Sequence, residues 1–90
     1  MIETSRPIEG TDYEARAISM AEMQQVVACD KGDLYAAAML AHFGTYSGDE
    51  RVWSTMEKAL EAPYPVCKAA SEAVMALNVP SDPEGDAAGN

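Results

Sequence analysis

Apolar residues recur at helical spacing in four stretches of the chain, and turn-forming residues gather between those stretches. Two stretches open on a Ser-x-x-Glu capping box, at Ser19 and at Ser54, which pairs amide groups that the first helical turn leaves free. We therefore predict a mainly α fold, a small bundle of about four short helices. The helices are expected near residues 19–30, 33–43, 54–62 and 65–78.

Three segments between and before these helices follow other patterns. Residues 13–18 alternate between apolar and polar side chains, which is typical of a short strand, although Thr11 also opens a capping box from which a helix could start. We prefer the strand, so that a short N-terminal strand or hairpin could accompany the bundle. Residues 44–53 combine turn residues with a short apolar end and predict either a hairpin tip or a loop.

The domain boundaries follow from composition. Residues 1–12 contain Pro7 and Gly10, show no period and are expected to form an extended N-terminal arm. Residues 13–79 are expected to form one helical domain, because 90 residues accommodate a single core. Residues 80–90 hold three acids, no base and no large apolar side chain, so burial cannot offset their ordering entropy. We expect a disordered acidic tail there, and an intact fold after truncation at Val79.

The charge of the chain excludes several classes of partner. Fifteen acidic and six basic residues give a net charge of −9. Nucleic acid is not expected as a partner, because phosphate binding needs clustered lysines and arginines, and an anionic membrane is disfavoured for the same reason. No apolar run approaches the roughly 20 residues of a membrane span, and no signal-peptide pattern is present. We therefore expect a cytoplasmic protein in which Cys29 and Cys67 are reduced.

No set of residues indicates catalysis, so we predict neither an enzyme nor a cofactor. His42 has no motif that would supply a nucleophile and an orienting group, and is expected near a helix C-terminus, where it favours the helix dipole. Cys29, Cys67 and His42 are too few and too scattered for a zinc site. The spacing of the acids does not match a calcium loop, nor that of the glycines a phosphate loop. No metal site is expected.

The composition favours protein binding instead. Six methionines, one tryptophan and four tyrosines accompany few large aliphatic residues, and short alanine-striped helices cannot enclose all of this surface. An exposed apolar patch is typical of a binding site. We place it at the break between the last two helices, where Pro63 and Pro65 would hold a tyrosine outward. Core packing is the alternative role of its aromatic residues. The expected protein-binding residues are Trp53, Met56, Tyr64 and Val66.

The order of segments along residues 13–78 carries a family resemblance. A capped helix at AISMAE is followed by the apolar helix LYAAAMLAHF, by the turn YSGDERVW and by the segment STMEKALEAPYPVCKAASEAVMALN. This order resembles the tail assembly chaperones of long-tailed bacteriophages over about three quarters of the chain. The resemblance implies a protein of the host cytoplasm that coats the tape measure protein until tail-tube subunits replace it. It also implies a longer form made by translational frameshifting.

A second class of function fits the size and the charge. Small acidic phage proteins can inhibit host defence complexes through nucleic-acid mimicry, as some anti-CRISPR proteins do. Both hypotheses require a protein partner, and the same apolar patch could also bind copies of this chain as a homo-oligomer. Co-purification with a tape measure or tail-tube protein would favour the chaperone, and co-purification with a nuclease complex would favour the inhibitor.

Overall fold

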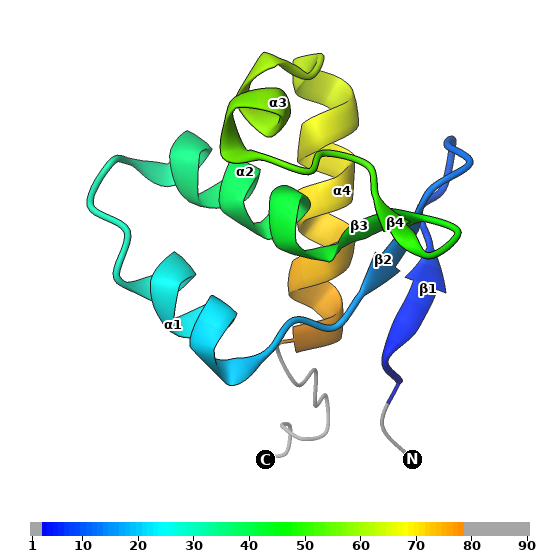
Figure 1. Cartoon of the computed structure of the whole chain (residues 1–90), viewed down its shortest axis with the longest axis horizontal. Coiled ribbons are helices and arrows are strands. Elements are labelled where there is room, and N and C mark those ends of the chain that lie inside the picture. The colour runs from blue at the N-terminus through cyan, green and yellow to red at the C-terminus, as the bar shows by residue number, and fades with distance from the viewer. Residues whose placement is uncertain (1–2, 79–90) are drawn as a thin grey trace, which may run out of the picture.

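The computed structural model describes residues 3–78 and shows an α+β domain (Figure 1). Helices make up 54% and strands 14% of this structure, so the prediction of a mainly α bundle is wrong. In chain order the elements are β1 (Ser5–Pro7), β2 (Glu14–Arg16), α1 (Met20–Val27), α2 (Asp33–Gly44), β3 (Thr45–Ser47), β4 (Glu50–Arg51), α3 (Met56–Glu61) and α4 (Tyr64–Asn78).

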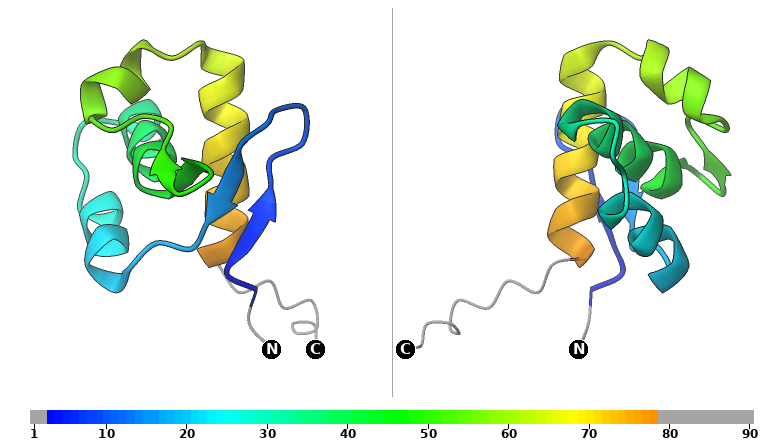
Figure 2. Two further views of the ribbon diagram at one scale, coloured as in Figure 1. Left: turned by 45° about the vertical axis from the view of Figure 1, so that its right-hand side comes forward. Right: turned by 90° about the vertical axis from the view of Figure 1, so that its left-hand side faces the viewer.

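The four strands form one antiparallel sheet in the order β1-β2-β3-β4. Two hairpins, β1-β2 and β3-β4, meet where Ala15 of β2 lies opposite Thr45 of β3. The β3-β4 turn contains two residues, and its first, Gly48, has a φ of 66°, the conformation that glycine favours in such turns. In Figure 2 the β1-β2 hairpin lies alongside α4.

The sheet was predicted only in part, because its strands are two or three residues long. Alternation becomes readable only over about four to eight residues. β2 lies inside the strand predicted at residues 13–18, and β3-β4 realises the hairpin alternative for residues 44–53. β1 lies in the segment expected to be an arm, where it pairs with β2, and Ile8 directly after it is buried.

The four helices lie at the predicted positions to within a few residues. The capping box at Ser19 is formed, with the Ser19 hydroxyl accepting from the Glu22 amide and the Glu22 carboxylate accepting from the Ser19 amide. The second box is not formed. α3 is instead capped one residue later, where the Thr55 hydroxyl accepts from the Lys58 amide.

The core lies where α2 and α4 pack against each other and against the sheet. Small residues at this crossing, Ala38, Ala41 and Ala70, are buried and allow a close approach. Gly44, the last residue of α2, packs directly against α4 and β2. A Cβ atom there would lie 2.7 Å from Val74 Cγ1 and 2.9 Å from the Arg16 carbonyl oxygen.

α1 is the most peripheral helix and packs on α2 through Val26 and Met23 (Figure 1). An ion pair between Glu22 of α1 and Arg51 of β4, at 2.9 Å, ties it to the sheet. No helix within residues 3–78 has both the length and the apolar character needed to cross a membrane. The tail predicted at residues 80–90 lies outside the described residues.

Candidate functional site

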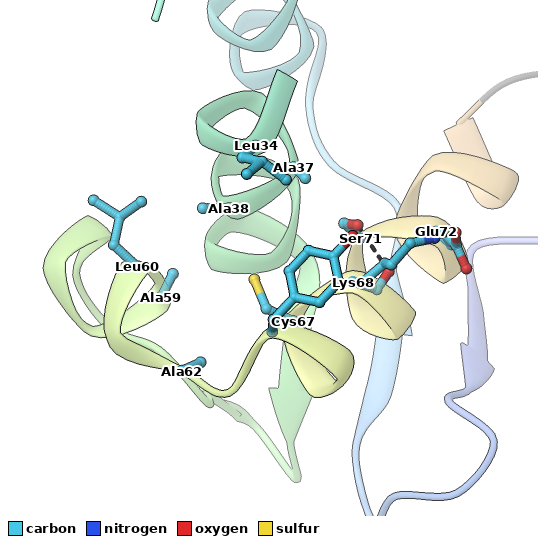
Figure 3. Close-up of a pocket in the computed structure, with 11 residues that line it drawn as sticks. Leu34, Ala37, Ala38, Ala59, Leu60, Ala62, Cys67, Lys68, Ser71 and Glu72 are labelled. Atoms are coloured by element: carbon cyan, nitrogen blue, oxygen red, sulfur yellow. Dashed lines mark hydrogen bonds and ion pairs between the residues drawn. The ribbon is translucent and has the colours of Figure 1, made fainter. Parts of the chain in front are cut away.

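An apolar groove runs between the first half of α2, the short helix α3 and the first half of α4 (Figure 3). We call it the α2–α3–α4 groove. Its volume is about 460 Å³, within the range of ligand-binding clefts. The side chains that shape it are Leu34 and Ala37 from α2, Leu60 from α3, Ala62, and Tyr64 and Cys67 from α4.

The shortness of α3 creates the groove. Its six residues end at Glu61, and the extended backbone of Ala62 with the following Pro63 turns the chain into α4. α3 rests on the domain through Ala59, which is 1% exposed. The next residue, Leu60, is rotated by about 100° around the helix and therefore lies beside the groove instead of in the core.

Three large apolar side chains border the groove from three different helices. Leu34 is 69% exposed, Tyr64 57% and Leu60 50%. Single exposed apolar residues are common on protein surfaces, whereas a cluster around one concave site is typical of an interaction site. Covering the exposed remainder of each would contribute on the order of 1 kcal/mol, since each is already partly buried. The groove thus offers substantial apolar surface that this chain leaves open.

The polar groups on the α4 side of the groove pair with one another. Lys68 forms an ion pair with Glu72 one turn later, which raises the pKa of the lysine. The buried Ser71 hydroxyl donates to the Lys68 carbonyl oxygen at 2.8 Å. Burial raises the pKa of the Cys67 thiol, whose sulfur points into the space between the helices (Figure 3). This wall therefore presents a neutral thiol and satisfied polar groups, which suits an apolar occupant.

The structure separates the predicted binding residues. Tyr64 borders the groove, whereas Met56 and Val66 are half-buried against the core. Trp53 is 9% exposed and packs edge-on against Tyr13, with the ring centroids 6.1 Å apart. Its position agrees with core packing, the alternative that the sequence left open for the aromatic residues.

His42 also lies in this part of the core. Its Nδ1 donates to the Trp53 carbonyl oxygen at 2.7 Å, because a carbonyl can only accept. The histidine is therefore a buried partner of the loop before α3, in addition to being in the last turn of α2. Within residues 3–78 no three His, Cys, Asp or Glu side chains are grouped so that they could hold a metal ion.

Leu34 and Leu60 lie in the apolar stretches from which helices 33–43 and 54–62 were predicted, and neither was among the expected binding residues. A usable signal existed for Leu60. Adjacent residues on a helix differ by about 100° in direction, so a six-residue helix that buries Ala59 places Leu60 toward the edge of its buried face. For Leu34, the usable sign of exposure is its position in the first turn of α2, at the end of the helix. Comparison with protein-family models, with curated proteins and with solved structures found no match to this chain.

Proposed function

We propose that this chain is a protein-binding module that holds an apolar segment of a partner in the α2–α3–α4 groove, and that it serves as a phage tail assembly chaperone for a tape measure protein. The observation that carries the proposal is the placement of Leu34, Leu60 and Tyr64, half-exposed or more, around one groove. The order of segments that resembles the chaperone family supports the choice of partner.

The geometry suits a helix of the partner better than an extended strand. An extended segment pairs with the edge strand of a sheet, whereas the groove is lined by helices α2, α3 and α4. An amphipathic helix instead inserts side chains spaced at i, i+3 or i+4, and i+7. Leu34, Leu60 and Tyr64 provide three apolar contacts that could receive the apolar side chains along one face of such a helix.

Binding by co-expressed tape measure fragments tests the proposal. Leu60→Glu places a charge at the groove, so we expect it to abolish co-purification of the fragment. Tyr64→Ala is expected to weaken binding by about 2 kcal/mol, roughly 30-fold. Both residues are exposed, so the melting temperature should change by only a few degrees. Ala76→Glu adds the same charge at an exposed position outside the groove and should bind normally.

Thiol labelling gives a second readout on the unmodified protein. Cys67 lines the groove, whereas Cys29 lies beyond the end of α1, away from it. A bound segment should slow alkylation of Cys67 and leave the rate at Cys29 unchanged. Equal rates with and without the fragment, or normal binding by Leu60→Glu, would count against the groove. Recovery of a nuclease complex in place of the fragment would instead support the defence-inhibitor hypothesis.

A further inference from the structure

The solvent side of α3, next to the α2–α3–α4 groove, is acidic. Leu60, which lines the groove, points about 100° around the helix from the buried Ala59. Glu57 and Glu61 both point about 160° from Ala59, so they lie beyond Leu60 on the outer side of the helix. Both acids are exposed. They therefore form an acidic rim along one edge of an apolar groove.

A third exposed acid, Asp33, is the first residue of α2, another wall of the groove. Lys31, two residues earlier in the chain, has its amino group over the Tyr35 ring, 5.0 Å from the centroid. Within residues 3–78, neither Asp33 nor the two acids of α3 form an ion pair. The rim thus carries three acids whose charge no described side chain neutralises.

The lysines of α3 and α4 have other partners. Lys68, on the α4 wall, forms its ion pair with Glu72. The amino group of Lys58 donates to the Ser54 hydroxyl at 3.4 Å, on the N-terminal side of α3. Neither lysine offsets the three rim acids, so the groove is apolar inside and negatively charged at its edge.

We propose that the occupant of the groove is a basic amphipathic helix, whose apolar face enters the groove and whose lysines or arginines meet the rim acids. This inference rests on the proposed function and specifies the chemistry of its partner. Glu57 and Glu61 are like charges one turn apart, and Glu61 lies in the last turn, at the negative end of the helix dipole. A cation placed over the two carboxylates relieves both unfavourable interactions. A neutral partner leaves them in place, and an acidic partner adds to them.

The rim acids and the apolar residues of the groove have different roles in this recognition. Leu34, Leu60 and Tyr64 carry no charge, so they contribute affinity for any helix with a suitable apolar face. The rim acids select among such helices by charge, and the net charge of −9 attracts a cationic helix from a distance. The partner segment should therefore combine apolar residues at helical spacing with lysines or arginines beside them.

Synthetic helical peptides test the inference on the full chain by isothermal titration calorimetry. The peptides share one apolar face, with leucines at i, i+4 and i+7, and carry lysines, glutamines or glutamates at the positions beside it. At about 20 mM salt the lysine peptide should bind about tenfold more tightly than the glutamine peptide, and the glutamate peptide more weakly than either. At about 0.5 M salt the affinities should converge, because exposed charges are then screened.

Paired charge removals locate the preference on the rim. The double variant Glu57→Gln, Glu61→Gln should reduce the advantage of the lysine peptide to about threefold or less. The matched control Glu9→Gln, Asp12→Asn removes the same charge from exposed positions in the β1-β2 turn. In Figures 1 and 2, α4 lies between that turn and α3, so this control should keep the tenfold preference. Tyr64→Ala removes an apolar contact and should weaken the lysine and glutamine peptides by similar factors.

The contrary outcomes separate this inference from the proposed function. Equal affinities of the lysine and glutamine peptides at low salt, both weakened by Tyr64→Ala, would overturn the basic partner and leave the groove as the binding site. An equal loss of preference in the two double variants would also overturn the inference, because the overall charge would then be responsible. Absence of binding by every peptide, or binding that Tyr64→Ala leaves unchanged, would overturn the groove and the inference together.

Discussion

Gly44 shows how a single residue can fix the distance between elements. Its Cα lies so close to Val74 and to the Arg16 carbonyl that a methyl group has no room. We expect Gly44→Ala to lower the free energy of unfolding by about 1–3 kcal/mol, measured by urea denaturation. Val74→Ala should relieve part of the crowding, so the double variant should lose less than the sum of the two single costs. Additive costs would show that the contact with Val74 is not the cause.

Thr45, the next residue, is fully buried in β3, and its hydroxyl oxygen has no hydrogen-bond partner among the described residues. A buried unpaired hydroxyl costs about 1–3 kcal/mol. Replacing it by a methyl group in Thr45→Val keeps the branched shape that suits a strand. We expect a rise of about 1 kcal/mol in the free energy of unfolding. Thr45→Ser, which keeps the hydroxyl and loses the methyl group, should be less stable than the wild type.

Cys67 makes the free energy of unfolding depend on pH in the alkaline range. Burial raises the pKa of its thiol above the ordinary value of 9.0. Because the pKa is higher in the folded state, the associated stability is fully present below about pH 9 and is lost as the pH rises through the folded pKa. The difference in unfolding free energy between wild type and Cys67→Ala should therefore be constant from pH 7 to about pH 8.5 and should shrink above pH 9. Parallel curves up to pH 10.5 would contradict this expectation.

Among the elements, α1 depends on the contacts at its ends. Eight residues are too few for a helix to be stable by itself, so capping and packing must hold it. Glu22 accepts from the Ser19 amide with one oxygen and from Arg51 with the other. We expect Glu22→Ala to cost about 1–2 kcal/mol and to speed hydrogen exchange in α1 more than in α4. Arg51→Met, which keeps the cap, should cost less; an equal cost would assign the whole effect to the ion pair.

The helices were predictable, whereas the pairing of the strands into one sheet was not, and particular residues show why. Ser19 and Glu22 mark a helix start by local hydrogen bonds, which leave a direct trace in the sequence. β1 and β3 form strands because they pair with β2. A strand of three residues is too short to show an alternation of apolar and polar side chains that would predict this pairing. The groove was predictable in part. Pro63 predicted the break that leaves Tyr64 exposed. The exposure of Leu34 depends on how α2 packs against α3 and α4, which the sequence pattern does not indicate.

At the scale of the whole molecule, the N-terminal segment completes the domain. Ile8 is 2% exposed, and its amide donates to the Tyr13 carbonyl oxygen to close the β1-β2 hairpin. We expect Ile8→Ala to lower the free energy of unfolding by about 2–4 kcal/mol, a large share of the stability of a domain this small. Met20→Ala, an exposed truncation, should cost under about 0.5 kcal/mol. If Ile8→Ala also lowered the free energy of unfolding by less than about 0.5 kcal/mol, the N-terminal segment would not be needed for the stability of the domain.

The direct passage of α2 into β3 has a consequence for folding. Gly44 ends the helix and Thr45 begins the strand, so no loop separates the two. A helical register error in α2 would rotate β3 away from β2, and a slipped sheet would displace α2 from α4. The two parts can therefore form only together, and β2–β3 pairing, which closes a segment containing both α1 and α2, is the slow entropic step. The fold should consequently appear and disappear as one kinetic unit, with α1 alone free to open ahead of it.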